Sequence, residues 1–259
     1  ILVEIVKQLI ETHTDLQVDH RRNFQGASLV HAAFQSGDVD FYVSHTGTQF
    51  TGVLGMEVTE EWKDRDKVLA YVQDQFQDRF DATWFAPFGF NNTYALVLKR
   101  DTMEKLGLSN MSDLAEYAPS LRIAVDQTFM ARLGDGFYDM ADHYGYDFKQ
   151  AVSMDYGLMY RAVAAGEVDA AVAYSTDGRI SALGLDILID DHQFFPPYDC
   201  SLVVSNDILE KHPIIQKLIE PLIGAIDEST MQALNKRVDV EHRDPAEVAR
   251  EYLKQQGLI

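Results

Sequence analysis

Aromatic side chains are the residues in this sequence that best suggest chemistry. Tyr94, Tyr174 and Tyr198 each fall at the end of an expected strand or at an expected crossover between lobes, and His45 ends a similar strand. Each tyrosine face attracts a cation by about 0.5–2 kcal/mol through the ring quadrupole, so a cluster of them suits a quaternary ammonium group, which has no hydrogen to donate. The alternative is that these tyrosines are core residues with hydrogen-bonded hydroxyl groups.

Two polar residues could bind an anionic group. Arg132 lies between an expected strand and an expected helix, where its two-pronged guanidinium could pair with a ligand carboxylate. It could equally form a surface ion pair. Thr48 follows His45 in an expected turn, and its hydroxyl could donate to the same carboxylate or cap the next helix.

The sequence lacks the common signatures of catalytic and cofactor sites. It contains no HExxH motif, no GxSxG nucleophile elbow and neither of the usual glycine-rich phosphate loops. The single Cys200 excludes an internal disulfide and a four-cysteine metal site. We therefore expect no catalytic residue, no cofactor and no metal. An enzyme that uses His45 or Asp177 as a base is an alternative from another class.

Composition narrows the class of protein further. The 259 residues, 46% of them hydrophobic, are enough for one large domain or two smaller ones. The net charge of -19 argues against nucleic acid and against an anionic membrane surface as partners, although it could attract cationic solutes. No apolar run approaches the roughly 20 residues that span a bilayer, and we recognise no signal peptide.

A faint internal repeat positions two of the ring residues. Residues 37–48 and 166–178 each begin with a glycine that would end a helix in the left-handed conformation. A short strand follows, which ends in His45 or Tyr174, and then turn residues. Two such units predict two similar lobes, each with a ring at the carboxyl end of a strand, where open α/β sheets bind ligands.

The rest of the chain alternates expected helices and strands, which indicates an α/β fold. Expected helices cover 1–13, 27–36, 49–56, 59–80, 111–115 with Ser112 as N-cap, 134–144, 158–165, 213–226, 229–238, and a last helix that Asp244 caps before Pro245. Expected strands cover 16–18, 91–99, 121–125, 185–189 and 202–204. We expect lobe I to comprise residues 1–93 and 200–259 and lobe II residues 94–199, joined by two crossovers near 92–96 and 196–202.

Five segments carry a resemblance to a known family. They are 89–96 (GFNNTYAL), 154–160 (MDYGLMY), 173–180 (AYSTDGRI), 194–199 (FFPPYD) and 244–249 (DPAEVA). In this order the chain resembles, over essentially its whole length, the substrate-binding proteins of glycine betaine/carnitine/choline ABC importers. The resemblance implies a two-lobed periplasmic-binding-protein fold of type II, with the ligand cleft between the lobes.

The resemblance also implies a function and a set of site residues. The protein would be a non-enzymatic receptor that captures glycine betaine, carnitine, choline or a similar quaternary ammonium solute as its lobes close, and delivers it to a membrane permease. It would be an extracytoplasmic monomer, either periplasmic or lipid-anchored. The cation cage would comprise Tyr94, Tyr174, Tyr198, His45 and Asn92, and the carboxylate would be bound by Arg132 and Thr48.

The chain departs from the family pattern at two places. Members usually have tyrosine before Thr-Gly-Thr, where this sequence has His45. With an ordinary pKa, a protonated His45 would weaken cation binding below about pH 6.5, and the change could instead mark a larger trimethylammonium ligand such as ergothioneine. Members also open with a strand and a Phe-Thr-Glu-Gln-like segment, whereas this sequence opens in a helix, so we expect one strand of lobe I and one ligand contact to lie outside it.

Overall fold

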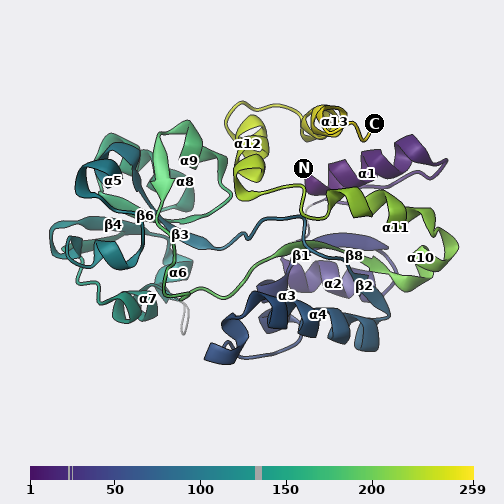
Figure 1. The fold of residues 1–259 in the computed structure, drawn as a ribbon, viewed down its shortest axis with the longest axis horizontal. Coiled ribbons are helices and arrows are strands. Elements are labelled where there is room, and N and C mark those ends of the chain that lie inside the picture. The colour runs from purple at the N-terminus through teal and green to yellow at the C-terminus, as the bar shows by residue number, and fades with distance from the viewer. Residues whose placement is uncertain (23, 25, 132–135) are drawn as a thin grey trace. The chain divides into compact units, whose positions relative to one another are not determined.

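The computed structural model describes residues 1–22, 24, 26–131 and 136–259, and it divides into two compact units. Unit 1 comprises Ile1–Asn92 and Pro196–Ile259, and unit 2 comprises Thr93–Phe195. The chain therefore passes from one unit to the other twice, after Asn92 and after Phe195 (Figure 1). Within the described part of the chain, every helix is too short or too polar to traverse a bilayer.

Unit 1 contains a three-stranded antiparallel sheet. Its order is β1 (Phe41–His45), β8 (Cys200–Ser205), β2 (Ala82–Trp84), so the central strand comes from the C-terminal segment. The helices of this unit are α1 (Leu2–His13), α2 (Ala27–Gln35), α3 (Thr46–Gly52), α4 (Arg65–Phe80), α10 (Asn206–Lys211), α11 (Ile214–Ile219), α12 (Glu228–Asp239) and α13 (Pro245–Gln255), with short 3-10 helices at Glu60–Lys63 and Glu220–Leu222.

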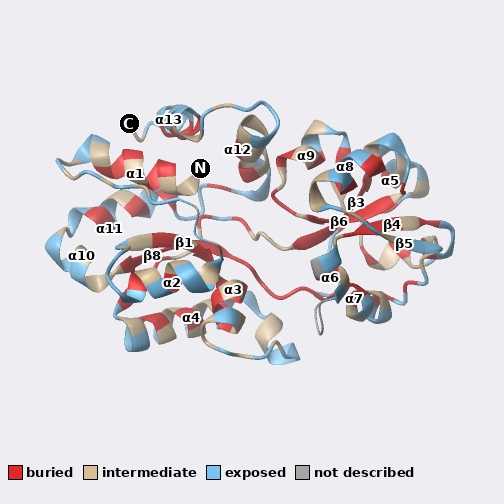
Figure 2. Cartoon of the chain, turned by 180° about the vertical axis from the view of Figure 1, so that it is seen from behind, coloured by how far each residue is buried: buried red, intermediate tan, exposed pale blue. Residues whose placement is uncertain are grey.

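The helices of unit 1 cover both faces of its sheet. On one face α1, α11 and α13 pack on the side chains of Leu202 and Val204, and on the other α2, α3 and α4 surround Val203 (Figure 1). Successive side chains of a strand point to opposite faces, so β8 supplies apolar residues to both layers. The run Leu202–Val204 is consequently buried throughout, as expected for a strand covered on both sides (Figure 2).

Unit 2 contains a five-stranded mixed sheet. Its order is β5 (Gln150–Ser153), β4 (Arg122–Val125), β6 (Ala170–Tyr174), β3 (Tyr94–Lys99), β7 (Leu185–Ile187). Strand β3 is antiparallel to both of its neighbours, whereas β4 is parallel to both of its own. The helices are α5 (Arg100–Leu106), α6 (Gln127–Ala131), α7 (Phe137–Tyr144), α8 (Tyr156–Ala165) and α9 (Gly178–Ala182), with 3-10 helices at Ser112–Leu114 and Ala118–Ser120.

The two copies of the repeat fold as predicted up to the ends of their strands. Helix α2 is followed by Gly37 with φ 77°, and α8 ends at Gly166 with φ 78°, a left-handed conformation that glycine adopts without steric cost. Strands β1 and β6 follow, and each ends in its ring residue, His45 or Tyr174. The predicted turn after His45 is wrong, because helix α3 begins directly at Thr46.

Two other local predictions are also wrong. Residues 16–18 form no strand, since local side chains accept their backbone N–H groups: Val18 N–H donates to the Glu11 carboxylate at 2.9 Å. Ser112 does not cap a helix; its own N–H and hydroxyl donate to the Asp191 carboxylate. The predicted cap at Asp244 is confirmed, because its carboxylate accepts from the N–H groups of the first turn of α13.

Candidate functional site

Unit 2 brings two of the predicted cage residues together. Tyr94 is the first residue of β3 and Tyr174 the last residue of β6, and the antiparallel register sets them directly opposite each other. Their ring centroids are 4.9 Å apart with 33° between the planes, and the Tyr174 hydroxyl donates to the Tyr94 hydroxyl at 3.4 Å. Cross-strand neighbours of this kind pack side by side, so the register itself builds the ring pair.

Three further aromatic residues extend this pair. The ring centroids of Phe129 and Phe195 lie 4.5 and 5.8 Å from the centroid of Tyr94. The ring centroid of Tyr156 lies 5.1 Å from that of Tyr174. The sequence interpretation assigned no role to these three. Phe195 and Tyr156 were nevertheless inside the family-like segments 194–199 and 154–160, which was the available signal.

Asp177, the alternative base, is engaged in an ion pair. It caps α9 and accepts two hydrogen bonds from the guanidinium of Arg179, and the Tyr156 hydroxyl donates to it at 3.0 Å. Burial alone would raise the pKa of the Asp177 carboxyl, but the hydrogen bonds from Arg179 outweigh it and lower that pKa. A carboxylate held in this way is a weak proton acceptor, which disfavours the enzymatic alternative.

In unit 1 the predicted residues gather around the start of α3. His45 ends β1, Thr48 lies in the first turn of α3, and the Tyr198 ring lies against Gly47, where an added Cβ would be only 2.9 Å from the ring. Asn92 donates its N–H to the carbonyl of Tyr198 at 3.1 Å. The structure therefore groups four of the predicted ligand residues within this unit.

An ion pair between a buried carboxylate and a partly exposed arginine, which the sequence interpretation missed, supports this group. The Asp199 side chain is only 3% exposed and accepts a two-pronged pair of hydrogen bonds from Arg65 on α4. The Asp199 backbone carbonyl accepts from Thr46 N–H at 2.9 Å, so the segment after Tyr198 is fixed to the start of α3. Arg65 and Asp199 are 134 positions apart, so no local pattern could have related them.

His45 corrects one prediction directly. Burial lowers the pKa of its imidazole to about 4, although the nearby Asp199 carboxylate acts in the opposite direction. The imidazole is therefore neutral over the whole range from pH 5.5 to 8. The expectation that protonation of His45 would weaken cation binding below about pH 6.5 required an ordinary pKa, and the lowered pKa contradicts that condition.

Arg132, the predicted carboxylate ligand, lies outside the described residues. The six described members of the predicted site fall into two sets, His45, Thr48, Asn92 and Tyr198 in unit 1 and Tyr94 and Tyr174 in unit 2. Among residues 1–22, 24, 26–131 and 136–259 there is no group of three histidine, cysteine, aspartate or glutamate residues that could hold a metal ion.

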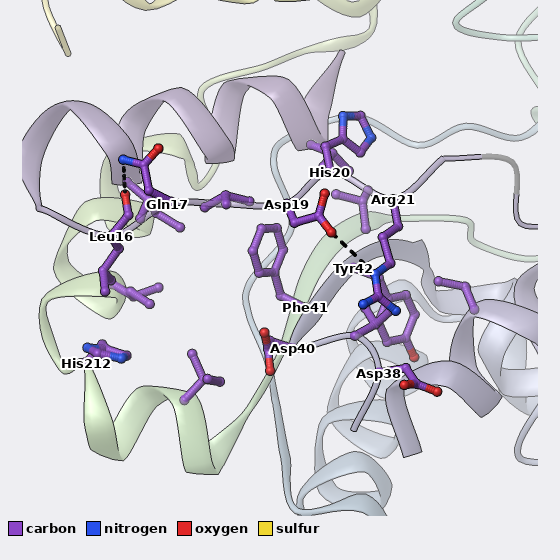
Figure 3. Close-up of a pocket in the computed structure, with 18 of the residues that line it drawn as sticks. Leu16, Gln17, Asp19, His20, Arg21, Asp38, Asp40, Phe41, Tyr42 and His212 are labelled. Carbon is purple, nitrogen blue, oxygen red and sulfur yellow. Dashed lines mark hydrogen bonds and ion pairs between the residues drawn. The ribbon is translucent and has the colours of Figure 1, made fainter. Parts of the chain in front are cut away.

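A separate cavity in unit 1 contains none of the predicted site residues. Its volume is about 410 Å³, and it lies between residues 16–21 and residues 38–43 (Figure 3). Apolar side chains from α1 and α11, such as Ile10 and Ile215, line it together with Asp40 and His212. It is therefore distinct from the group of residues around the start of α3.

Comparisons with known proteins identify the family of the chain. Residues 1–255 match the family model described as the substrate-binding domain of the ABC-type glycine betaine transport system. The carnitine transport binding protein OpuCC of Listeria monocytogenes is 40% identical over 260 residues, which cover 100% of this chain and 83% of that protein. The ergothioneine transport permease/ergothioneine binding protein EgtU of Helicobacter pylori is 30% identical over all of this chain and 46% of its own length.

A solved structure gives the same result for the fold. A crystal structure of a glycine betaine/carnitine/choline ABC transporter protein superposes with a TM-score of 0.94 at 38% identity, covering 98% of this chain and 93% of the other. The predicted α/β, two-lobed periplasmic-binding-protein fold is thus confirmed. OpuCC, which matches this chain over its whole length, is named as a transport binding protein. The chain belongs to the family of substrate-binding domains of ABC-type glycine betaine transport systems.

Proposed function

We propose that this chain is the receptor of an ABC importer that binds glycine betaine, carnitine, choline or a similar quaternary ammonium solute. The observation that carries the proposal is the Tyr94–Tyr174 ring pair, found in a chain that belongs to this family. A trimethylammonium group carries a full charge but no N–H, so ring faces suit it better than hydrogen-bond acceptors. Tyr198 and His45 of unit 1 complete the proposed cage, with Asn92 beside them.

The carboxylate of a betaine would be bound separately from its cation. We assign this role to Thr48, through its hydroxyl, and to Arg132, through a two-pronged ion pair. Choline has no carboxylate, so it would depend on the cage alone. Comparing choline with glycine betaine therefore measures what this part of the proposed site contributes.

The proposed site draws on both units, which suggests the mechanism. A ligand that makes its full set of contacts only when residues of both units reach it favours the closed state by the difference in binding free energy. Capture, closure and delivery to a membrane permease would then complete the cycle without bond chemistry. We place the protein outside the cytoplasm, periplasmic or lipid-anchored, and expect a monomer.

A larger ligand is the second candidate. The Helicobacter pylori relative is named for ergothioneine, a trimethylammonium compound, and His45 replaces the tyrosine expected from the family pattern. A histidine ring is smaller than tyrosine and leaves more space in the cage. Competition between ergothioneine and glycine betaine for the same site distinguishes the two candidates.

The test is calorimetric titration with glycine betaine, carnitine, choline and ergothioneine at neutral pH. We expect saturable binding of at least one of them, and Tyr174→Ala should weaken it roughly 5- to 150-fold, which corresponds to about 1–3 kcal/mol. Tyr138→Ala is the matched control, since Tyr138 lies on α7 with 65% of its surface exposed. No binding of any of the four, or equal binding by Tyr174→Ala, would contradict the proposal.

A further inference from the structure

Near Tyr174, unit 2 contains a half-buried cation, the guanidinium of Arg179. The guanidinium of Arg179 lies over two ring faces, 5.0 Å from the centroid of Tyr156 and 4.4 Å from that of Tyr160. The two rings are nearly perpendicular, at 89°, and their hydroxyl groups are hydrogen-bonded to each other. We call Tyr156, Tyr160, Asp177 and Arg179 the Arg179 cluster.

Each member of the Arg179 cluster is tied to another, which makes the cluster rigid. Arg179 donates from Nε to one Asp177 oxygen at 2.9 Å and from a terminal nitrogen to the other, a two-pronged geometry that fixes the guanidinium plane. The side chain of Asp177 is 8% exposed. Tyr160 is fully buried. Neither Asp177 nor Tyr160 is therefore free to move toward solvent.

The Arg179 cluster contacts Tyr174 at two points. The Tyr156 ring lies 5.1 Å from the Tyr174 ring, at 51° between planes, and so borders one side of it. The Tyr160 hydroxyl accepts a hydrogen bond from the Tyr174 backbone N–H at 3.4 Å, at the point where β6 ends. The cluster thus holds both the ring and the backbone of Tyr174.

The charge balance of the cluster suits a cation site nearby. Arg179 alone would repel a quaternary ammonium group, but the Asp177 carboxylate neutralises it at hydrogen-bond distance. The guanidinium also lies over the ring faces of Tyr156 and Tyr160, so these two rings already make a cation–π contact within the cluster. Their part is therefore to support Tyr174, which remains the ring next to Tyr94.

We propose that Arg179 is a positioning residue of the cation cage: with Asp177, Tyr156 and Tyr160, it fixes the orientation of Tyr174. The effect of Arg179 on ligand affinity rests on the proposed function. Its effect on the orientation of Tyr174 does not, because that effect exists with or without a ligand. An arginine is required, because lysine supplies the charge without the planar fork or the stacking surface.

The first readout needs no ligand. The ring signals of Tyr174 are followed by NMR in protein labelled with ¹³C tyrosine and assigned by their loss in Tyr174→Phe. We expect Arg179→Met, and to a lesser degree Arg179→Lys, to shift or broaden these signals. Arg161→Met is the matched control, since Arg161 is exposed on the same helix as Tyr160 and its replacement changes the charge equally. Unchanged Tyr174 signals in a folded Arg179→Met or Arg179→Lys protein would overturn the proposal.

The second readout is a double-mutant cycle on glycine betaine affinity. Arg179→Met should weaken binding at least tenfold in the wild-type background but less than twofold in a Tyr174→Ala background, because its effect passes through Tyr174. An equal loss in both backgrounds would show that Arg179 acts elsewhere, and would also overturn the proposal. A wild-type protein that binds no trimethylammonium ligand refutes the proposed function alone, while the NMR comparison still decides the role of Arg179.

Discussion

At the scale of single residues, His45 shows how burial changes what a side chain can do. On sequence grounds it could switch binding off in mild acid, but burial keeps the imidazole neutral by lowering its pKa to about 4. A neutral imidazole presents a ring to a cation without repelling it. As a neutral ring, His45 is compatible with the proposed cage.

The pH dependence of affinity tests this assignment. We expect the dissociation constant for glycine betaine to change less than twofold between pH 8 and 5.5, and to rise only as the pH approaches 4, where His45 becomes protonated. Calorimetric titrations at half-unit steps measure it. His45→Tyr is the control, because any dependence that remains in that variant arises from other groups. A tenfold loss of affinity at pH 5.5 that His45→Tyr abolishes would contradict the prediction.

Gly47 is the second residue on which the candidate site depends. A Cβ at this position would lie 2.6 Å from the carbonyl oxygen of Pro197 and 2.9 Å from the Tyr198 ring, closer than side chains tolerate. Because the nearest atom belongs to the backbone, Gly47→Ala should displace Tyr198, lower the free energy of unfolding by about 1–3 kcal/mol and weaken ligand binding.

Gly52 at the end of the same helix provides the control. A Cβ there meets nothing within 4 Å, so Gly52→Ala should leave stability unchanged or raise it by up to about 1 kcal/mol. Urea unfolding and ligand titration of both variants give the comparison. If Gly47→Ala were as stable as wild type and bound ligand normally, Tyr198 would not depend on this close approach.

At the scale of elements, a buried carboxylate attaches helix α1 to the chain that follows it. The Glu4 side chain is 5% exposed, lies 2.6 Å from His20 Nδ1 and accepts from Arg22 at 2.9 Å. Burial alone would raise the pKa of Glu4, but the hydrogen bonds from these two partners outweigh it and lower that pKa. The ionised form is therefore the one that stabilises the fold.

The sign of this shift gives a stability prediction. A carboxyl whose pKa is lower in the folded state stabilises the protein above its unfolded value of about 4.5, and this contribution is lost as the pH falls through the folded value. Glu4→Gln should therefore destabilise the protein by about 1–3 kcal/mol at pH 7, and the difference should shrink below pH 4. Urea unfolding at both pH values measures it, with the exposed Glu104→Gln on α5 as control. A difference independent of pH would assign the effect to packing.

Local signals predicted the elements that local interactions form. The cap at Asp244 and the amphipathic helix at residues 1–13 depend on neighbours a few positions away, and both are confirmed. Residues 16–18 are apolar enough for a strand, but a strand also needs a partner, which no local pattern can reveal. Strand β5 has a partner but lacks the local signal, and the sequence interpretation missed it. It lies at the sheet edge with mostly exposed residues, so its sequence shows no apolar alternation.

The candidate site also contains residues that the sequence could indicate and residues that only the structure reveals. Strand-end positions and the family resemblance picked out Tyr94 and Tyr174, but their direct contact results from a register between strands 80 positions apart. The ion pair of Arg65 with Asp199 depends on contacts that no spacing in the sequence encodes. Sequence reasoning therefore identified the proposed ligand contacts, whereas the residues that support them required the structure.

At the scale of the whole molecule, the order of the chain makes unit 1 dependent on its C-terminal segment. Strand β8, the centre of its sheet, begins at Cys200, after all of unit 2 has been traversed. It pairs with β1 and β2, more than 100 residues earlier, so unit 1 must close a long loop before its sheet can form. Unit 2 is continuous from Thr93 to Phe195 and has no such requirement.

The net charge of -19 leads to a last prediction about ligand class. A strongly acidic molecule attracts cations over distances comparable to the Debye length, about 30 Å at 0.01 M salt and about 8 Å at 0.15 M. Choline carries one positive charge, whereas glycine betaine is a zwitterion with none overall. We therefore expect choline affinity to fall several-fold between 0.01 and 0.3 M NaCl, while glycine betaine affinity changes less than twofold. Titrations of both ligands in the same buffers make each the control for the other. Equal salt dependence would mean that the ligand responds only to its immediate contacts, and that the acidic surface serves solubility alone.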